Sequence, residues 1–220
     1  MMSDFIYTPP QEPLITLYED DDLIAIDKPA GLLSVMGRQP EHYDSAYWRI
    51  LQQFPQAKVI HRLDMATSGI LLFAKHRDME VAMSKLFQAR QVDKQYHAIV
   101  SGNLQGNGQI DVPLIADWER RPRQKVDFEL GKPALTLYQA VNYLNQYDET
   151  LVQLIPITGR SHQLRLHLAY IGYAIIGDKL YHAYPEQGRL GRLALHATHL
   201  SFRHPLRTHI VQINSVMPFV

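Results

Sequence analysis

His61-Arg62-Leu63-Asp64-Met65-Ala66-Thr67-Ser68-Gly69 is a polar segment set between two apolar runs. Val59 and Ile60 come before it, and Ile70-Leu71-Leu72-Phe73-Ala74 follows it. The second run is short and ends at a charged pair, which is the pattern of a buried strand. Polar groups held this close to a core need partners or take part in chemistry. The residues alone fit two interpretations: a turn whose Asp and Thr bond their own backbone, or a functional segment.

The composition limits the class of protein. Of the 220 residues, 46% are hydrophobic, which suffices for the core of one domain, with or without an insertion. No apolar run has the length that a membrane span needs. Residues 1–27 hold seven acidic residues and no Lys or Arg, unlike a secretory or transit peptide. Cysteine is absent, so disulfides, thiolate nucleophiles and Cys metal ligands are excluded, and we expect a cytoplasmic protein.

The charges are unevenly distributed along a chain whose formal net charge is zero. Residues 158–209 hold seven Lys or Arg against two acidic residues, together with seven of the 11 histidines. A neutral protein can still present one basic face, and affinity for phosphate groups depends on that face.

Hydrophobic periodicity predicts a chain dominated by strands in hairpins. Three helices are expected over 45–54, 78–89 and 161–171, with Asp44 or Ser45 capping the first and Ser161 the third. The acidic run between the first two strands is interpreted as a solvated turn and not as a metal site. The predicted strands are 14–18, 23–27, 70–74, 95–102, 109–114, 136–143, 151–156 and 210–213.

A basic segment interrupts this pattern at residues 117–132, and we call it the basic arm. Its cations surround Pro122 and lie beside Trp118, which predicts an exposed loop or hairpin. Cations next to an aromatic side chain suit contacts with phosphate groups and stacking on bases. A solvated charged turn is the alternative. The cations around Pro122 are Arg120, Arg121, Arg123 and Lys125.

The stretch at 61–69 resembles the HRLDxxTSG motif of the RluA family of RNA pseudouridine synthases. Such a long string of polar positions is far more specific than a lone glycine motif. Other segments resemble further motifs of that family in the same order, so that the resemblance runs from about residue 14 to the C-terminus. They are Lys28-Pro29-Ala30-Gly31-Leu32-Leu33-Ser34, Lys94-Gln95-Tyr96-His97-Ala98, Ile157-Thr158-Gly159-Arg160-Ser161-His162-Gln163-Leu164-Arg165-Leu166-His167, Gly177-Asp178-Lys179-Leu180-Tyr181 and Leu195-His196-Ala197.

The resemblance implies a site and a substrate. Asp64 takes the place of the family's catalytic Asp, Tyr96 of its active-site Tyr and Arg165 of its active-site Arg. The implied substrates are stem-loops of large-subunit (23S) ribosomal RNA and of the tRNA anticodon arm. We also expect the enzyme to be a monomer. The candidate substrate-binding residues are Arg62, His61, Thr67, Arg160, His162 and the four cations around Pro122, Arg120, Arg121, Arg123 and Lys125.

The resemblance and the pattern of hairpins agree on the fold. Strands that come as hairpins and not as βαβ units predict the α+β class with an antiparallel or mixed sheet. The family adds that the sheet is long and bent, flanked by helices and loops, with the catalytic cleft at its middle. We expect a loosely ordered tail over 1–13 and one catalytic domain over 14–220, without a separate RNA-binding domain.

Pseudouridine formation explains why these residue types would be needed. The reaction breaks the bond between ribose C1′ and uracil N1, turns the base and rejoins it through C5. No redox step or group donor takes part, so we expect no cofactor and no metal. Asp64 supplies the one carboxylate, Tyr96 can act as acid or base, and Arg165 could keep Asp64 ionised. The uridine must first leave its stem-loop, and Arg62 could fill the gap.

Other classes of function compete with this one. An RNA N-glycosidic hydrolase of the two-carboxylate type would need a second acid, and none lies within the Asp64 motif or beside Tyr96 or Arg165. A metallohydrolase is disfavoured because His162 and His167 are five residues apart and no HExxH pattern occurs. An RNA-binding module without catalysis remains possible, although it would not require Asp64, Tyr96 and Arg165 together.

Overall fold

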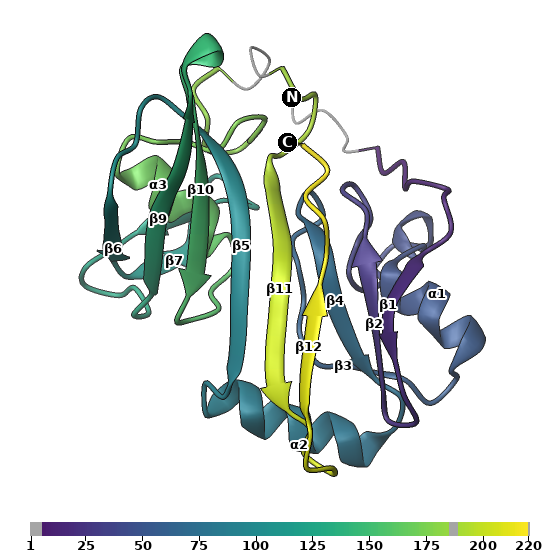
Figure 1. Cartoon of the computed structure of the whole chain (residues 1–220). Coiled ribbons are helices and arrows are strands. Elements are labelled where there is room, and N and C mark those ends of the chain that lie inside the picture. The colour runs from purple at the N-terminus through teal and green to yellow at the C-terminus, as the bar shows by residue number, and fades with distance from the viewer. Residues whose placement is uncertain (1–5, 185–188, 220) are drawn as a thin grey trace. The chain divides into compact units, whose positions relative to one another are not determined.

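The computed structural model describes residues 6–184 and 189–219 and divides into two compact units (Figure 1). The first unit comprises Met1–Asp93 and His199–Val216, and the second comprises Lys94–Thr198 and Met217–Val220. Each unit has its own strand pairs and helices, so that the candidate site residues can be located within each.

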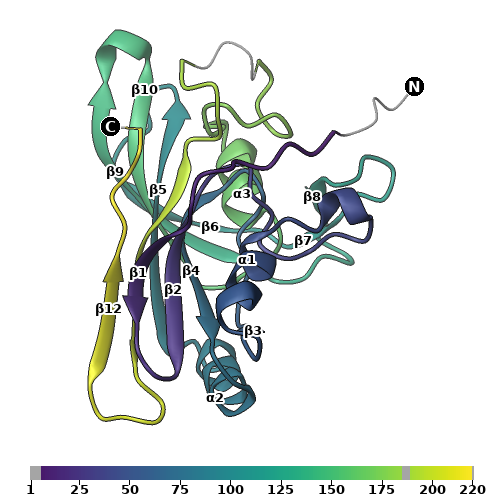
Figure 2. The same cartoon turned by 90° about the vertical axis from the view of Figure 1, so that its right-hand side faces the viewer.

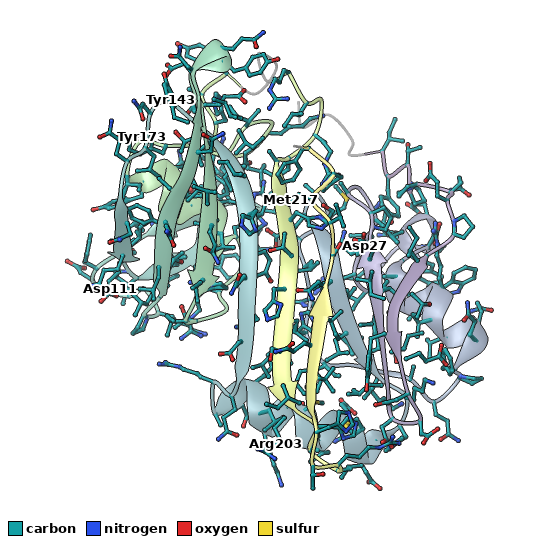
Figure 3. All side chains as sticks on the ribbon, viewed as in Figure 1. Asp27, Asp111, Tyr143, Tyr173, Arg203 and Met217 are labelled. Atoms are coloured by element: carbon teal, nitrogen blue, oxygen red, sulfur yellow. The ribbon has the colours of Figure 1, made fainter. Side chains whose placement is uncertain are left out.

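The sheet of the first unit is built on a fully buried strand. β4 (Ser68–Ala74) is buried at all seven positions and pairs antiparallel with β2 (Leu23–Lys28) and β3 (Lys58–Val59). β1 (Ile15–Glu19) forms a hairpin with β2, and the β11 (Leu195–Arg203) residues from His199 pair with β12 (Ile210–Asn214). The Ser215 hydroxyl donates to Asp27 Oδ2 at 3.0 Å and ties the end of β12 to β2 (Figure 3).

Two helices of the first unit begin at side-chain caps. α1 (Ala46–Gln53) follows Ser45, whose hydroxyl accepts the Trp48 N–H at 3.2 Å, as one of the two predicted caps requires. α2 (Arg77–Gln88) follows His76, whose Nδ1 accepts the Met79 N–H at 3.3 Å. α2 packs against β3 and β4, and a short 3₁₀ turn (Pro40–His42) precedes α1.

The second unit contains an antiparallel sheet in the order β5, β10, β9, β6 (Figure 1). Burial alternates from Val152 to Pro156 of β10, whereas Ala98, Ile99 and Val100 of β5 are all buried and Thr136 is the buried residue of β9. A 3₁₀ turn (Asn145–Tyr147) connects β9 to β10. The bounds of the strands are β5 (Val92–Ser101), β6 (Asn107–Asp111), β9 (Leu135–Leu144) and β10 (Glu149–Pro156).

The second unit also carries a helix and a separate hairpin. α3 (Gln163–Tyr170) packs against β9 and β10. β7 (Leu114–Ala116) and β8 (Gln124–Val126) form the two-stranded hairpin of the basic arm (Figure 2). The predicted cap of α3 is wrong: the N-cap is His162, in a left-handed conformation with φ 54°, and not Ser161.

Most predicted elements are present, with shifts of a few residues at their ends. β3 and β11 were not predicted, and the hairpin of β7 and β8 is one of the two structures expected for the basic arm. β11 is buried on both faces over most of its length, so that the alternation that marks the other strands is missing. Residues 6–13, the described part of the expected loose tail, contact the first unit: the Tyr7 hydroxyl donates to Asp44 O at 2.8 Å. No helix in the described part of the chain has the length and apolar character of a membrane span.

Candidate active site

Asp64 lies in a tight turn that leads into β4. The Thr67 N–H donates to the Asp64 carbonyl oxygen at 3.1 Å, and β4 begins at the next residue. Asp64 is half-buried, whereas Thr67 is only 2% exposed. The segment is therefore a backbone turn that places the carboxylate just before a buried strand, and a catalytic part of Asp64 stays a prediction.

A buried lysine fixes the residue that follows this carboxylate. Lys28 is 0% exposed, and its ammonium group donates to the carbonyl oxygens of Pro29, Leu32 and Met65 at 2.9, 2.8 and 3.1 Å. The Gly31 N–H donates to the same Met65 oxygen at 2.8 Å. Two donors thus converge on the carbonyl group one residue after the carboxylate, and a buried ammonium needs such partners.

A serine fixes the residue on the other side. The Ser34 hydroxyl donates to Leu63 O at 2.6 Å and accepts the Leu63 N–H at 3.1 Å. Both residues are buried, at 5% and 7% exposure. The position of Asp64 is therefore set by hydrogen bonds to the backbone of its two neighbours.

The other candidates of this motif take different positions. His61 Nε2 accepts the Leu72 N–H at 3.0 Å, and its ring stacks on Phe87 with centroids 5.2 Å apart. His61 thereby anchors the segment to β4 and α2. Arg62 is exposed. Contacts of His61, Arg62 and Thr67 with a substrate stay predictions.

Tyr96 points to the face of the second unit's sheet on which α3 packs. It lies opposite Leu154, which lies opposite Tyr138, and paired residues of a sheet share a face. Thr136, two residues before Tyr138, points the same way, and its Oγ1 lies 2.9 Å from Nδ1 of His167 on α3. Strand alternation thus directs the half-buried Tyr96 toward the side of the sheet that carries the helix with Arg165.

Arg165 is held by a buried ion pair. Its Nε and Nη2 lie 2.7 Å from Oδ2 and Oδ1 of Asp178, and the two side chains are 5% and 0% exposed. This two-point geometry fixes the plane of the guanidinium. Gly177 allows Asp178 to reach this position, because it has φ +73° and a Cβ there would lie 2.0 Å from Arg192 O.

The residues at the start of α3 are tied to neighbouring loops. The exposed Arg160 donates from Nε to Pro133 O at 3.1 Å. Its N–H donates to Gln163 Oε1 at 3.0 Å. His162 Nδ1 lies 2.8 Å from the Tyr181 hydroxyl. Both candidates therefore have protein partners, and their contact with a substrate stays a prediction.

The basic arm is exposed at its tip, as predicted. Trp118 is 69% exposed, and the Arg121 guanidinium lies 3.5 Å from the centroid of its ring, a stacked cation–π contact. Arg120 donates from Nε to the buried carboxylate of Asp117 at 2.8 Å. The tip therefore offers an aromatic face and a guanidinium already held against it.

The rest of the basic arm adds cations and two exposed apolar side chains. Arg123 is half-buried, and Lys125 is exposed, with Nζ 3.9 Å from the Asp127 carboxylate. Phe128 and Leu130 are 71% and 73% exposed. The Asp127 carboxylate accepts the Leu130 N–H at 2.9 Å, and this bond lowers the pKa of Asp127.

Among the described residues, Asp20, Asp22 and His204 form a group that could hold a metal ion. His204 Nε2 lies 3.3 Å from Asp20 Oδ2 and 3.7 Å from Asp22 Oδ2, without the direction of a hydrogen bond. His204 Nδ1 accepts the Leu206 N–H at 3.3 Å, so the neutral ring carries its proton on Nε2. A metal bond would need this nitrogen without its proton.

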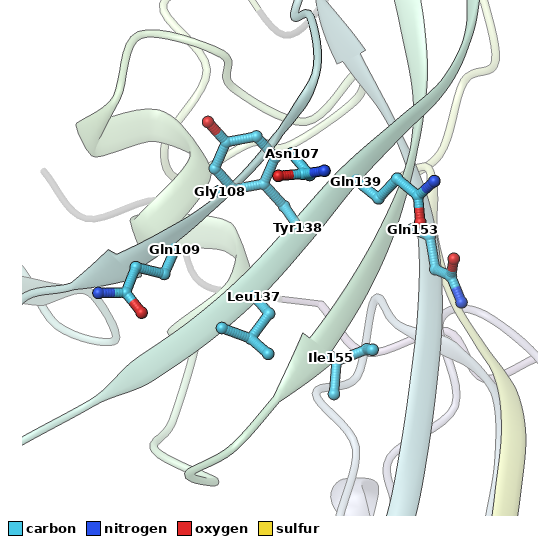
Figure 4. A pocket seen from close by; sticks show the side chains of 8 residues that line it. All are labelled: Asn107, Gly108, Gln109, Leu137, Tyr138, Gln139, Gln153 and Ile155. Atoms are coloured by element: carbon cyan, nitrogen blue, oxygen red, sulfur yellow. The ribbon is translucent and has the colours of Figure 1, made fainter.

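A pocket of about 400 Å³ opens on the sheet of the second unit (Figure 4). Gln153 lies opposite His97, the residue after Tyr96, so it points to the other face of the sheet. Tyr138 belongs to the face of Tyr96, but most of the lining residues point to the face away from Tyr96 and α3. It is lined by Asn107, Gly108, Gln109, Leu137, Tyr138, Gln139, Gln153 and Ile155.

The profile of the RNA pseudouridylate synthase family matches residues 22–170, a span that contains Asp64, Tyr96 and Arg165. Because the match covers more than half of the chain, the protein belongs to this family, and the resemblance of its motifs is confirmed. It is an enzyme of the isomerase class that converts uridine to pseudouridine in RNA.

Two curated bacterial relatives of this chain carry the same name. The chain is 52% identical over 206 residues to the dual-specificity RNA pseudouridine synthase RluA of Vibrio cholerae, covering 92% of this chain and 82% of the relative. It is 47% identical over 201 residues to the protein of the same name from Escherichia coli, covering 90% and 91%.

Solved structures confirm the predicted α+β fold. Human RNA Pseudouridylate Synthase Domain Containing 1 superposes with a TM-score of 0.78 at 25% identity, covering 100% of this chain and 88% of that one. Domain Containing 4 gives 0.72 at 25% identity, covering 93% and 89%.

Two residues that hold the candidate site together, Lys28 and Asp178, were not predicted from the sequence. Lys28 and Asp178 lie within segments that resemble family motifs, but neither was given a role. An Asp after a glycine near an apolar run is a weak signal, since many such residues form exposed turns. Only burial distinguishes Asp178, and burial does not appear in a local pattern.

Proposed function

We propose that Asp64 is the catalytic carboxylate of uridine isomerisation in ribosomal RNA and tRNA stem-loops. The observation that carries the proposal is the pair of backbone anchors on either side of this residue. Ser34 holds Leu63 and Lys28 holds Met65, which limits the movement of the turn. Preorganised placement of a reacting group can supply much of a barrier reduction, so that a fixed carboxylate suits this reaction.

Tyr96 and Arg165 complete the proposed chemistry. The carboxylate acts as nucleophile or base while the C1′–N1 bond breaks. After the base turns, a bond forms from C1′ to C5, the C5 proton leaves, and N1 gains a proton. Tyr96 can accept or relay a proton of this kind. Arg165, whose plane is fixed by Asp178, supplies positive charge for the carboxylate or for charge that develops on the detached uracil.

The substrate reaches this chemistry by extrusion of the uridine from its loop. Base flipping costs a few kcal/mol, and side chains that fill the gap offset that cost. The exposed Arg62 is our candidate for this part. The basic arm is the candidate for gripping the RNA, because Arg121 and Trp118 together offer a charge for phosphate groups and a face for bases.

The substrates and the state of the enzyme are further parts of the proposal. The names of both bacterial relatives state dual specificity, and the resemblance implies 23S ribosomal RNA and tRNA anticodon stem-loops. We expect a cytoplasmic monomer, which gel filtration with light scattering would test. Mapping of pseudouridines in total RNA with and without the protein would identify the positions.

Release of tritium from C5-labelled uridine in RNA tests the proposal. Asp64→Asn should lower the turnover rate by at least 1000-fold, roughly the loss seen when a catalytic group is removed. The affinity for RNA should remain close to that of wild type. The exposed Asp93 offers the matched control, and Asp93→Asn should be as active as wild type. Residual turnover of Asp64→Asn within tenfold of wild type would contradict the assignment.

The same assay separates the alternatives. A hydrolase would release free uracil and leave an abasic site, whereas the isomerase leaves the mass of the RNA unchanged. A binding module would retain both the tritium and the uridine. Mass spectrometry of nuclease digests detects the abasic site of a hydrolase. Tritium release separates the isomerase from a binding module, because uridine and pseudouridine have the same mass.

A further inference from the structure

We propose that Tyr181 is a positioning residue that couples the basic arm to Arg165. Docking of RNA on the arm would then affect the position of the Arg165 guanidinium. This inference rests on the proposed function, because it assigns a partner to an arm and an arginine that act on RNA. Tyr181 has three separate contacts that lead to these two regions.

The first contact joins Tyr181 to the basic arm. The Gln124 N–H, at the start of β8, donates to the Tyr181 hydroxyl oxygen at 2.7 Å. This backbone group is bonded to a side chain outside the hairpin and not to the facing strand. A shift of β8 would therefore move or break a short hydrogen bond to Tyr181.

The second contact joins the same hydroxyl to the start of α3. Its oxygen lies 2.8 Å from His162 Nδ1, and the two rings meet edge to face with centroids 5.7 Å apart. Because the amide of Gln124 can only donate, the hydroxyl keeps its own proton for Nδ1. His162 then accepts at Nδ1 and, as a neutral ring, carries its proton on Nε2.

The third contact joins the ring and backbone of Tyr181 to Arg165. The Arg165 guanidinium lies 5.4 Å from the ring centroid. The Tyr181 N–H donates to Asp178 Oδ1 at 3.2 Å, and the same oxygen is 2.7 Å from Arg165 Nη2. The carboxylate that fixes Arg165 is thus itself fixed in part by the Tyr181 backbone.

These contacts form one connected network. A displacement of the arm reaches the hydroxyl, the hydroxyl positions His162 and the ring, and the ring lies beside Arg165. Packed side chains and hydrogen-bond networks of this kind can carry coupling between two sites. Tyr181 is that member, and removal of its hydroxyl should separate arm docking from catalysis while Arg165 keeps the aromatic face.

The test is Tyr181→Phe, measured by single-turnover tritium release at saturating stem-loop RNA. We expect the rate to fall about tenfold, within the usual range of coupling between sites. The dissociation constant and the unfolding midpoint should remain close to wild type, which separates positioning from loss of structure. Tyr184→Phe is the matched control, because that hydroxyl belongs to a 64% exposed side chain three residues away.

A second variant tests the link from its other end. Gln124→Pro removes the N–H that donates to Tyr181, and Gln124→Ala retains it. We expect Gln124→Pro to slow the reaction and Gln124→Ala to leave the rate unchanged. The double variant of Gln124→Pro and Tyr181→Phe should be no slower than the slower single variant. If the Pro variant fails to fold, the Tyr181→Phe result decides by itself.

The outcomes are distinct. A Tyr181→Phe enzyme that reacts as fast as wild type overturns the inference and leaves the proposed function intact. Rate losses that multiply in the double variant show two independent effects and also overturn it. A wild-type protein that releases no tritium would instead count against the proposed function.

Discussion

The Asp64 turn and the Arg165 cluster hold a candidate catalytic side chain in opposite ways. Around Asp64 the hydrogen bonds go to the backbone of the neighbouring residues, from the hydroxyl of Ser34 and the ammonium of Lys28. Around Arg165 they go to the functional group itself, through the carboxylate of Asp178. The first unit therefore fixes a segment of chain, and the second fixes a charge.

This difference matters for energetics. A buried ion pair gains little over an apolar pair, but loss of one partner leaves a charge without compensation. Loss of a donor to backbone carbonyls leaves neutral acceptors without partners, at a smaller cost for each. Disruption of the Arg165 cluster should therefore destabilise the protein more than disruption of the Asp64 turn.

Asp178→Ala should have the largest effect on stability. It leaves the buried Arg165 without its carboxylate and should cost about 3–5 kcal/mol of unfolding free energy, measured by urea denaturation. The double variant Asp178→Leu with Arg165→Met removes both charges and should recover most of that loss while remaining inactive. An Asp178→Ala protein as stable as wild type would contradict the contrast between the two regions.

Lys28→Met should have the next largest effect. Three carbonyl groups lose a charged donor, with an expected cost of about 3 kcal/mol in urea denaturation. Because the Met65 carbonyl loses one of its two donors, the turn should loosen and the single-turnover rate should fall more than RNA affinity. The exposed Lys85 provides the control, and Lys85→Met should change neither quantity. Equal losses of rate and affinity would argue that Lys28 supports the fold without positioning the turn.

Lowering the pH should have a smaller effect on stability, which arises from His196 in the second unit. Burial lowers the pKa of His196 from 6.5 to about 4, with the cation of Arg192 as a lesser cause. The folded state then binds fewer protons than the unfolded state between these values, so this stability is present above pH 6.5 and is lost as the pH falls. Between pH 7 and pH 5 the loss should be about 2 kcal/mol.

The variant His196→Gln isolates this contribution. It should be less stable than wild type at pH 7, and its unfolding free energy should fall less steeply toward pH 5. Parallel pH profiles of the two proteins, measured by urea denaturation, would show that His196 does not titrate as expected.

The local pattern of the sequence was enough for many elements and insufficient for others. The alternation at the end of β10 and the apolar run of β4 reflect burial of one or both faces, which a short window records. β11 has polar residues at buried positions, including His196 and Thr198, because their partners come from distant parts of the chain. The N-cap predicted for α3 was wrong, because a His in the left-handed conformation has no sequence signal as strong as that of a capping Ser.

The residues of the candidate site also fall into two groups, those that the sequence predicts and those that it does not. Asp64, Tyr96 and Arg165 were recognisable because the type and order of polar residues around them are specific. The places of Lys28, Asp178 and Tyr181 could not be predicted from spacing. Each has its part through contacts with residues from other segments.

The sequence by itself determined the family, the fold class and the identity of the candidate carboxylate, because reactive groups must be written into the chain. The tertiary structure decided what holds those groups: the carbonyl groups around Lys28, the ion pair of Arg165 with Asp178 and the network of Tyr181 with Gln124. The physical reason is that burial and hydrogen-bond direction depend on where distant segments meet. A side chain such as Tyr181 has the same local sequence whether its hydroxyl faces water or a buried amide.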